Sequence, residues 1–529
     1  MANIEKDMGV AMNPISTATH GKAVQAVEIE RVTSPDELKK DHQDYARLDA
    51  EVAKYANAQR IKISISENKR LRGMINRRVL VVMGRKIHPA DVFTYFLQAL
   101  DKGTMSFASI MNIRQDLHLL NGQKYSWLTT CIYIAILIVE YPINRLIARL
   151  PIAKMLGTAV ILWGTTLALH AVCKDFAGLV TVRTLLGIFE AVCQPSFVVL
   201  SSMWYKRSEQ LLIVSLWYCM NGMQQIVGGL LAYCFTLIQH GPLKSWQAIF
   251  ITYGCFSVLW GCFVLWWMPD SPMRAKCFSE EDKHLMVERV RSNQTGLQNK
   301  HFRPEQVKEA LMDPQIWCYC LIQISTTLPT SGLGAFYAII IKDFGFTTLQ
   351  TQLLAMVLGV YIIIVLFSST WLVRKTGQNI LIMAVYVLPS IIGTVVLLTV
   401  ANTSKATKAG LLAAQTLGMS MLSRNVAGQT KKSVAVAANF VAWATGNAIG
   451  PQVFLTWNAP RYFIAFSTHM GCYALLLVVL AVLRWHLKHQ NDKRDAIAAA
   501  GVEQAKDERY LHAFEDLTDM QNVNFRYMY

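Results

Sequence analysis

The sequence has few charged residues for its length. Asp, Glu, Lys and Arg make up 16% of the 529 residues, whereas a soluble domain carries about 25%. The deficit is concentrated in long apolar blocks, which excludes a single soluble globular domain and predicts a polytopic helical membrane protein. The net charge of +16 lies mainly in tails and loops, where it suits anionic lipid headgroups and requires no nucleic acid.

Signatures of several other protein classes are also absent. The eleven cysteines lie almost all in apolar segments, so we expect no disulfide framework. There is no His-rich cluster and no Gly-rich phosphate loop ending in Gly-Lys-Ser/Thr, so we expect no metal, no cofactor and no enzyme activity. The polar N-terminal region has no apolar core segment, so we expect no cleavable signal peptide.

Twelve apolar segments are long enough to cross a bilayer, which predicts an all-α membrane protein with twelve transmembrane helices. Their approximate cores are 89–111, 125–147, 153–173, 176–203, 211–236, 247–268, 314–341, 350–372, 379–401, 408–426, 433–456 and 461–486. Two six-helix halves around a basic loop are the layout of the major facilitator fold, whose site lies between the halves at mid-depth. The predicted regions are a tail 1–86, a half 87–268, a central loop 269–313, a half 314–487 and a tail 488–529.

The basic flanks of the apolar segments set the expected orientation. Residues 67–86 are strongly basic and precede the first span, and Arg484, Lys488, Lys493 and Arg494 surround the end of the last one. An excess of Lys and Arg marks the cytosolic side, so we expect both tails and the central loop to be cytosolic. The sequon at Asn402 then faces outward as a glycosylation site, whereas the one at Asn293 is cytosolic and unused.

Two ionisable residues interrupt the apolar run 176–203. Arg183 and Glu190 are spaced so that they share a helical face with Gly187 and Gln194. A charge at membrane depth costs at least about 2.5–3.5 kcal/mol and normally faces a bundle interior or a watery cavity. We interpret Arg183 as an anion contact and Glu190 as a proton carrier; the alternative is an internal Arg–Glu ion pair that only ties helices together.

The first and second spans carry further ionisable residues away from their ends, among them Asp101, Lys102 and Glu140. At 1.5 Å per residue, Asp101 lies about 18 Å from the inner face, and Arg183 about 10 Å from the outer face of a core about 30 Å thick. The same arithmetic places Glu140 and Glu190 about 8–9 Å from the inner face. We therefore expect a central charged layer of Asp101, Lys102 and Arg183 that contacts the substrate, in which Asp101 could also carry a proton. We expect an inner layer of Glu140 and Glu190 that could carry protons.

Polar and aromatic residues recur at helical spacing in two later spans. Trp217 and Asn221 share a face of the fifth span, and Asn439 and Trp443 share a face of the eleventh. Cavity lining and helix–helix packing both explain such faces. Pro329, with two nearby glycines, predicts that the seventh span is a broken helix of the kind that lines transport sites.

Several long motifs occur in a defined order along the chain. They include V-R-T-L-L-G-I-F-E-A, L-W-Y-C-M-N-G, M-P-D-S-P, I-I-I-K-D-F-G-F-T-T-L-Q and G-N-A-I-G-P-Q. With them, the chain from about 91 to 488 resembles the fungal allantoate permease branch of the anion:cation symporter family, within the major facilitator superfamily. One departure is Asn144 before Arg145, where the general signature of this loop expects an acidic residue.

The resemblance implies proton-coupled uptake of a small organic anion, a carboxylate such as allantoate, nicotinate or cysteine. It implies substrate contacts at Arg183 and proton coupling at Glu190. We expect a monomer in the lipid bilayer of the plasma membrane, with the anion and protons as its partners. Two other functions stay open at this point: export of a metabolite by proton antiport, and nutrient sensing without transport.

Overall fold

The computed structural model of the chain describes residues 66, 70–71, 90–147, 150–205, 207–238, 242–270, 278–291, 304–399, 429–500, 518–520 and 526–527. These residues all belong to one compact unit, Ile63–Tyr529. Within these ranges the regular structure is entirely helical, without a strand. The predicted span 408–426 and the sequons at Asn293 and Asn402 lie outside the described residues.

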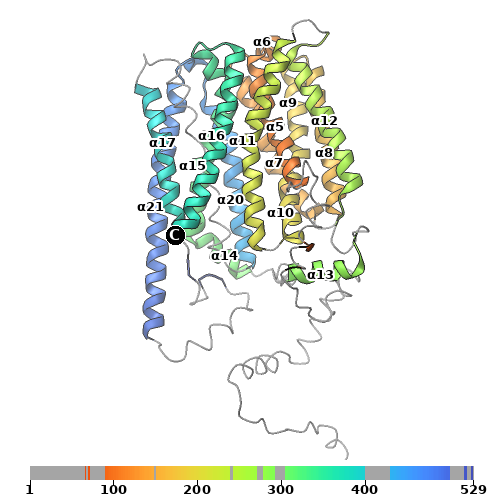
Figure 1. Ribbon diagram of the computed structural model, residues 1–529. Coiled ribbons are helices and arrows are strands. Elements are labelled where there is room, and N and C mark those ends of the chain that lie inside the picture. Colours follow the sequence, from red (N-terminus) through yellow and green to blue (C-terminus); the bar gives the residue numbers. More distant parts are fainter. Residues whose placement is uncertain are drawn as a thin grey trace, which may run out of the picture. The chain divides into compact units, whose positions relative to one another are not determined.

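The first six predicted spans correspond to observed helices (Figure 1). They are α5 (Ala90–Ile110), α7 (Lys124–Ile147), α8 (Ile152–Leu169) with η1 (His170–Val172), α9 (Phe176–Glu190) with α10 (Cys193–Trp204), α11 (Arg207–Leu237) and α12 (Ser245–Trp267), and the short α6 (Ile113–Asp116) follows α5. The fourth span is therefore not one continuous helix, because α9 ends at Glu190. The carboxylate of Asp175 caps the start of α9 by accepting from the Gly178 amide.

The remaining helices begin with α13 (Glu280–Arg291) and α14 (Pro304–Met312) between the two halves. The second half contains α15 (Pro314–Asp343), α16 (Thr348–Thr376), α17 (Asn379–Thr399), α20 (Gln429–Ile449), η2 (Gly450–Val453), η3 (Thr456–Asn458) and α21 (Phe463–Ala500). α21 continues well past the predicted end of its span at 486. In Figure 1, α6 lies at one end of the bundle, and α13 and α14 lie at the other.

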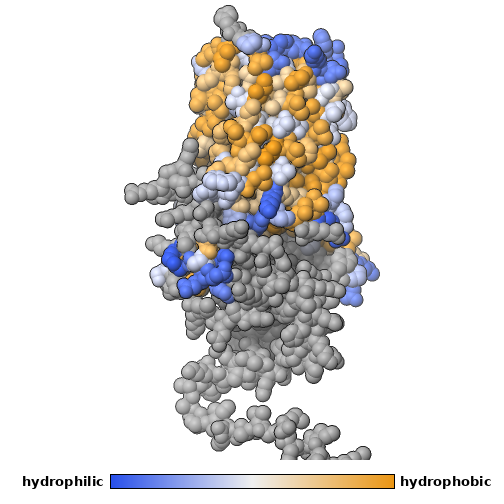
Figure 2. Space-filling view, turned by 90° about the vertical axis from the view of Figure 1, so that its right-hand side faces the viewer, coloured by the Kyte–Doolittle hydropathy of each residue, from blue (hydrophilic) through white to orange (hydrophobic). Residues whose placement is uncertain are grey.

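An apolar surface covers the sides of the helical body. Large side chains exposed there include Ile138, Trp266 and Trp485, each more than 65% accessible. Figure 2 shows hydrophobic residues along the side of the body and hydrophilic ones at its upper end. Eight helical segments of the described part are long and apolar enough to cross a membrane. α5, α11 and α20 are not among them, and α5 and α20 carry polar residues that face the interior.

The prediction of a broken seventh span is wrong, because α15 runs unbroken through Pro329. The nearby glycine serves packing instead. A Cβ added at Gly332 would lie 2.7 Å from the Gly450 carbonyl oxygen, so only glycine allows α15 to approach η2 this closely. The Ser331 hydroxyl also donates to the Asn447 carbonyl at 2.8 Å. Contact with α20 and η2 therefore holds α15 in one piece.

The two halves are joined near the α6 end of the bundle. The Tyr125 hydroxyl of α7 donates to the Ala335 carbonyl of α15 at 2.9 Å. The Thr130 hydroxyl donates to the Ala448 carbonyl of α20 at 2.7 Å. Lys342 Nζ donates to the Ile110 carbonyl at 3.1 Å. These contacts join α5 and α7 of the first half to α15 and α20 of the second.

Candidate functional site

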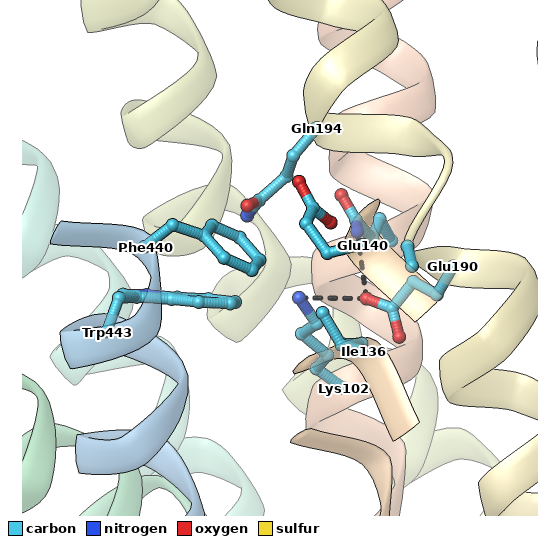
Figure 3. A pocket seen from close by; sticks show the side chains of 9 residues that line it. Lys102, Ile136, Glu140, Glu190, Gln194, Phe440 and Trp443 are labelled. Atoms are coloured by element: carbon cyan, nitrogen blue, oxygen red, sulfur yellow. Dashed lines mark hydrogen bonds and ion pairs between the residues drawn. The ribbon is translucent and has the colours of Figure 1, made fainter. Parts of the chain in front are cut away.

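One cavity lies between the two halves of the bundle (Figure 3). Its lining combines α5, α7 and the α9–α10 junction of the first half with α20 of the second. The nine lining residues are Gln98, Lys102, Ile136, Glu140, Glu190, Ala191, Gln194, Phe440 and Trp443. Its free volume of about 10 Å³ has room for roughly one water molecule. A metabolite therefore requires the two halves to move apart.

The polar centre of the cavity is an ion pair between Lys102 and Glu190. Lys102 Nζ lies 2.8 Å from Glu190 Oε1, and Gln98 Nε2 donates to the same oxygen at 2.8 Å. Gln98 and Lys102 are four residues apart on α5, which places both on one helical face. The Glu190 side chain is only 1% exposed, whereas that of Lys102 is 30% exposed. The cation is therefore the more accessible member of the pair.

Glu190 keeps one acceptor atom without a partner. Its Oε2 is buried and makes no hydrogen bond to any described residue. Glu190 is also the last residue of α9, so the interruption before α10 lies directly beside the cavity. This oxygen is a hydrogen-bond acceptor at the edge of the cavity that no described side chain occupies.

Aromatic side chains of α20 form the opposite wall. Lys102 Nζ lies 6.0 Å from the centre of the Trp443 ring, within the range of a cation–π contact. Phe440 lies beside Trp443, with ring centroids 5.3 Å apart, and Tyr133 meets Trp443 edge-on at 5.6 Å. Figure 3 shows Lys102 between Trp443 and Glu190. Phe440 is a lining residue that was not predicted as a site residue, although it lies three residues before Trp443, which was.

Glu140 and Gln194 occupy the rest of the polar lining. Glu140 Oε1 accepts from Asn144 Nδ2 at 3.1 Å, and its Oε2 is a buried atom without a partner among the described residues. Both residues were predicted from the sequence as members of the site. The lining thus holds one cation, two carboxylates and two amides.

Arg183 and Asp101 are buried outside the lining of this cavity. Asp101 is 1% exposed and accepts a short hydrogen bond from the Trp163 indole. Arg183 is 2% exposed and is close enough to Asp101 for an electrostatic interaction. Its Nε and Nη2 have no hydrogen-bond partner in the described part of the chain. The alternative of an Arg183–Glu190 ion pair is wrong, because Glu190 pairs with Lys102 instead. The flexible four-carbon stem of lysine lets Lys102 reach across the two predicted layers.

The other predicted lining residues contact neighbouring helices. Trp217 packs against Phe197 with ring centroids 5.7 Å apart. Asn221 Nδ2 donates to the Tyr95 hydroxyl at 3.2 Å, and Asn439 Nδ2 lies 3.5 Å from Gln323 Oε1. These three residues are not among the residues that line the cavity, and they contact neighbouring helices instead.

Comparison with known proteins agrees with this architecture. The Major Facilitator Superfamily model matches residues 92–451. The allantoate permease of Saccharomyces cerevisiae is 30% identical, over 89% of this chain and 88% of the relative. The thiamine pathway transporter of the same yeast is 32% identical, over 86% of this chain and 87% of the relative.

Among solved structures, a D-xylose–proton symporter matches with a TM-score of 0.55 at 14% identity, over 74% of this chain and 95% of that one. At this identity the match concerns the fold alone. The relatives are named as transporters and permeases rather than enzymes. The chain therefore belongs to the major facilitator superfamily, in the branch that resembles fungal allantoate permease, and is a multi-pass membrane transporter of a small molecule.

Proposed function

We propose that the protein takes up a small organic anion together with a proton, and that Lys102 is the anion contact. The observation that carries this proposal is the Lys102–Glu190 ion pair in a cavity between the halves. Lys102 is the one cation in the lining of this cavity, and its side chain is partly accessible. A carboxylate that reaches the cavity therefore has a charge-assisted donor to meet.

Glu190 supplies the link to protons. Lys102 and Glu190 together are neutral when the site is empty. An entering anion alone would leave a net negative charge in a poorly solvated site, which is unfavourable. When Glu190 takes up a proton, it releases Lys102 to the substrate carboxylate, and Lys102, Glu190 and the substrate together carry no net charge. The loaded and empty sites then have the same charge, so both can reorient across the membrane.

Arg183 is the second candidate for the anion contact. Its Nε and Nη2 are buried without a described partner, so they could accept an anion if the cavity extended past Lys102. Asp101 and Glu140 are the corresponding second candidates for proton coupling. Asp101 lies in the electrostatic field of Arg183, and Glu140 has an unpaired oxygen at the cavity.

Uptake by intact cells tests this function. Labelled allantoate, nicotinate, cysteine and a neutral sugar are offered at pH 5 and pH 7. We expect uptake of at least one carboxylate, faster at pH 5 and abolished by a protonophore, and no uptake of the sugar. Efflux from preloaded cells without uptake would indicate an exporter, and absence of both fluxes at normal surface expression would favour a sensor.

The cellular assignments belong to the same proposal. We propose a monomer in the plasma membrane, with both tails cytosolic and a glycan at Asn402. Surface biotinylation and glycosidase treatment of the Asn402→Gln variant test the location and the glycan. A glycan at Asn293, or protease access to loop 269–313 from outside intact cells, would overturn the orientation.

A further inference from the structure

A second buried ionic cluster lies at the α14 end of the second half, away from the cavity. Its centre is Lys431 in the first turn of α20, whose side chain is fully buried. Lys431 Nζ lies 2.7 Å from Asp313, 2.9 Å from Asp519 and 3.0 Å from Glu309. Asp313 is the N-cap of α15, and Glu309 belongs to α14. The third carboxylate comes from the far end of the chain.

Asp519 is held in this cluster from several sides. Its backbone carbonyl accepts from Arg494 Nη2 at 2.7 Å, and its Oδ2 accepts from the Tyr527 hydroxyl at 2.7 Å. The adjacent Thr518 hydroxyl donates to Glu309 Oε2 at 3.0 Å. Thr518 and Asp519 are both fully buried. Residues 518–519 are therefore docked on the helical body.

Tyr527 also contacts α21 and Asp519, and thereby holds the end of the chain at this cluster. Its backbone amide and carbonyl each form a 2.9 Å hydrogen bond with the side chain of Asn491 on α21. Its ring stacks under the Arg494 guanidinium at 4.5 Å. Burial and the neighbouring Asp519 raise the pKa of the Tyr527 hydroxyl, so it stays protonated and donates to that carboxylate. We call the four buried residues Thr518, Asp519, Asn491 and Tyr527, with Arg494, the C-terminal dock.

The charges of this cluster permit the end of the chain to leave. With Asp519 docked, three carboxylates lie within 3.0 Å of Lys431 Nζ, and Arg494 donates to the backbone carbonyl of Asp519. Without Asp519, Glu309 and Asp313 still neutralise the Lys431 ammonium. Undocking therefore leaves Lys431 paired, although it exposes donors that the dock satisfies, among them the Arg494 guanidinium.

We infer that the C-terminal dock is a releasable latch that fixes the inner end of α20 against α14, α15 and α21. α20 is also the helix that carries the aromatic wall of the cavity. Phe440 and Trp443 follow Lys431 by nine and twelve residues, which is about 14 and 18 Å along a helix. A latch on Lys431 therefore restrains the cavity wall. This inference uses the transporter fold but is independent of the proposed anion and proton.

Hydrogen–deuterium exchange of the purified full-length protein tests the latch. Asp519→Asn keeps the side-chain size and removes its charge, and Tyr527→Phe removes the hydroxyl that donates to Asp519. The matched control is Arg526→Ala, which breaks the exposed Arg526–Asp495 pair in the same segment. We expect both test variants to speed exchange at least threefold in residues 518–527 and in 429–443, while 176–190 and the control stay at wild-type rates.

Two results would overturn the inference. The first is faster exchange in 518–527 with no change in 429–443, which would make the dock a passive contact. The second is unchanged exchange in 518–527 in both variants and in the Asp519→Asn/Tyr527→Phe double variant, which would mean that these contacts do not hold the segment. Equal effects in the Arg526→Ala control would likewise contradict a latch centred on Lys431.

Discussion

Lys102 and Glu190 form an ion pair between a partly exposed cation and a buried carboxylate. In the proposed mechanism, a substrate carboxylate replaces Glu190 as the partner of Lys102. Removal of Lys102 leaves the buried Glu190 charge uncompensated and is costly, about 3–5 kcal/mol, whereas removal of Glu190 leaves only the partly exposed Lys102 unpaired. Replacement of both partners by neutral groups of similar size is tolerated far better. The pair therefore offers variants that separate folding from anion binding.

Lys102→Gln and the double variant Lys102→Gln/Glu190→Gln make this separation. We expect the single variant to reach the surface poorly, because Glu190 is left buried without its cation. The double variant should be expressed normally but lose affinity for the anion by about 10- to 150-fold, the equivalent of about 1.5–3 kcal/mol for a hydrogen bond to a charged group. Concentration-dependent uptake per surface transporter measures this loss. Arg183→Lys serves as the comparison. A larger loss of affinity for the anion in Arg183→Lys would identify Arg183, rather than Lys102, as the anion contact.

Trp443 contributes to the site through its ring. Its centre lies 6.0 Å from Lys102 Nζ, and a partly desolvated cation–π contact contributes about 0.5–2 kcal/mol. We expect Trp443→Leu to raise the apparent Michaelis constant by about 2- to 30-fold, and Trp443→Phe to raise it less. Trp217→Leu, outside the lining, is the control. If the Trp443→Leu variant and the wild type had equal apparent Michaelis constants, the Trp443 ring would not contribute to substrate binding.

At the scale of elements, the sequence predicted most helices and part of the site. The predicted span 89–111 corresponds to α5, although the polar residues of α5 lower its mean hydropathy. Lys102, Glu190, Gln194 and Trp443 were predicted as site residues from helical spacing and depth. The choice of Lys102 over Arg183 as the partner of Glu190 could not be predicted, because it depends on the rotation of α5 against α9.

The continuity of α15 was mispredicted for a related reason. Pro329 and the glycines that follow it are compatible with a break, but whether a helix breaks depends on its neighbours. Gly332 faces the Gly450 carbonyl, whereas Gly334 is exposed and a Cβ there would meet nothing within 4 Å. The same residue type thus has opposite environments two positions apart.

This contrast predicts opposite effects of one substitution. Gly332→Ala forces its Cβ to 2.7 Å from the Gly450 carbonyl oxygen, so we expect a destabilisation of about 1–3 kcal/mol. Gly334→Ala should be neutral or stabilise the helix by up to about 1 kcal/mol. Thermal unfolding in detergent, followed by tryptophan fluorescence, compares the two. Equal melting temperatures would show that α15 and η2 do not pack this closely.

At the scale of the whole molecule, contacts between the halves gather near the α6 end. Tyr125, Thr130 and Lys342 reach across at that end, while the cavity below them is lined by both halves. Transporters of this architecture work by rocking one half against the other around a fixed site. The Lys102–Glu190 pair lies in the cavity that such a motion would open and close, and α20 forms one wall of this cavity.

Proton uptake on substrate binding tests the central claim most directly. Purified wild-type protein in weak buffer with a pH indicator receives whichever carboxylate the uptake experiment identifies. If the substrate carboxylate replaces Glu190 as the partner of Lys102, the wild type should take up about one proton per bound anion near neutral pH. The Glu190→Gln variant should bind the anion without proton uptake and without pH dependence. Undiminished proton uptake by Glu190→Gln, at normal anion binding, would contradict the account and move proton coupling to Glu140 or Asp101.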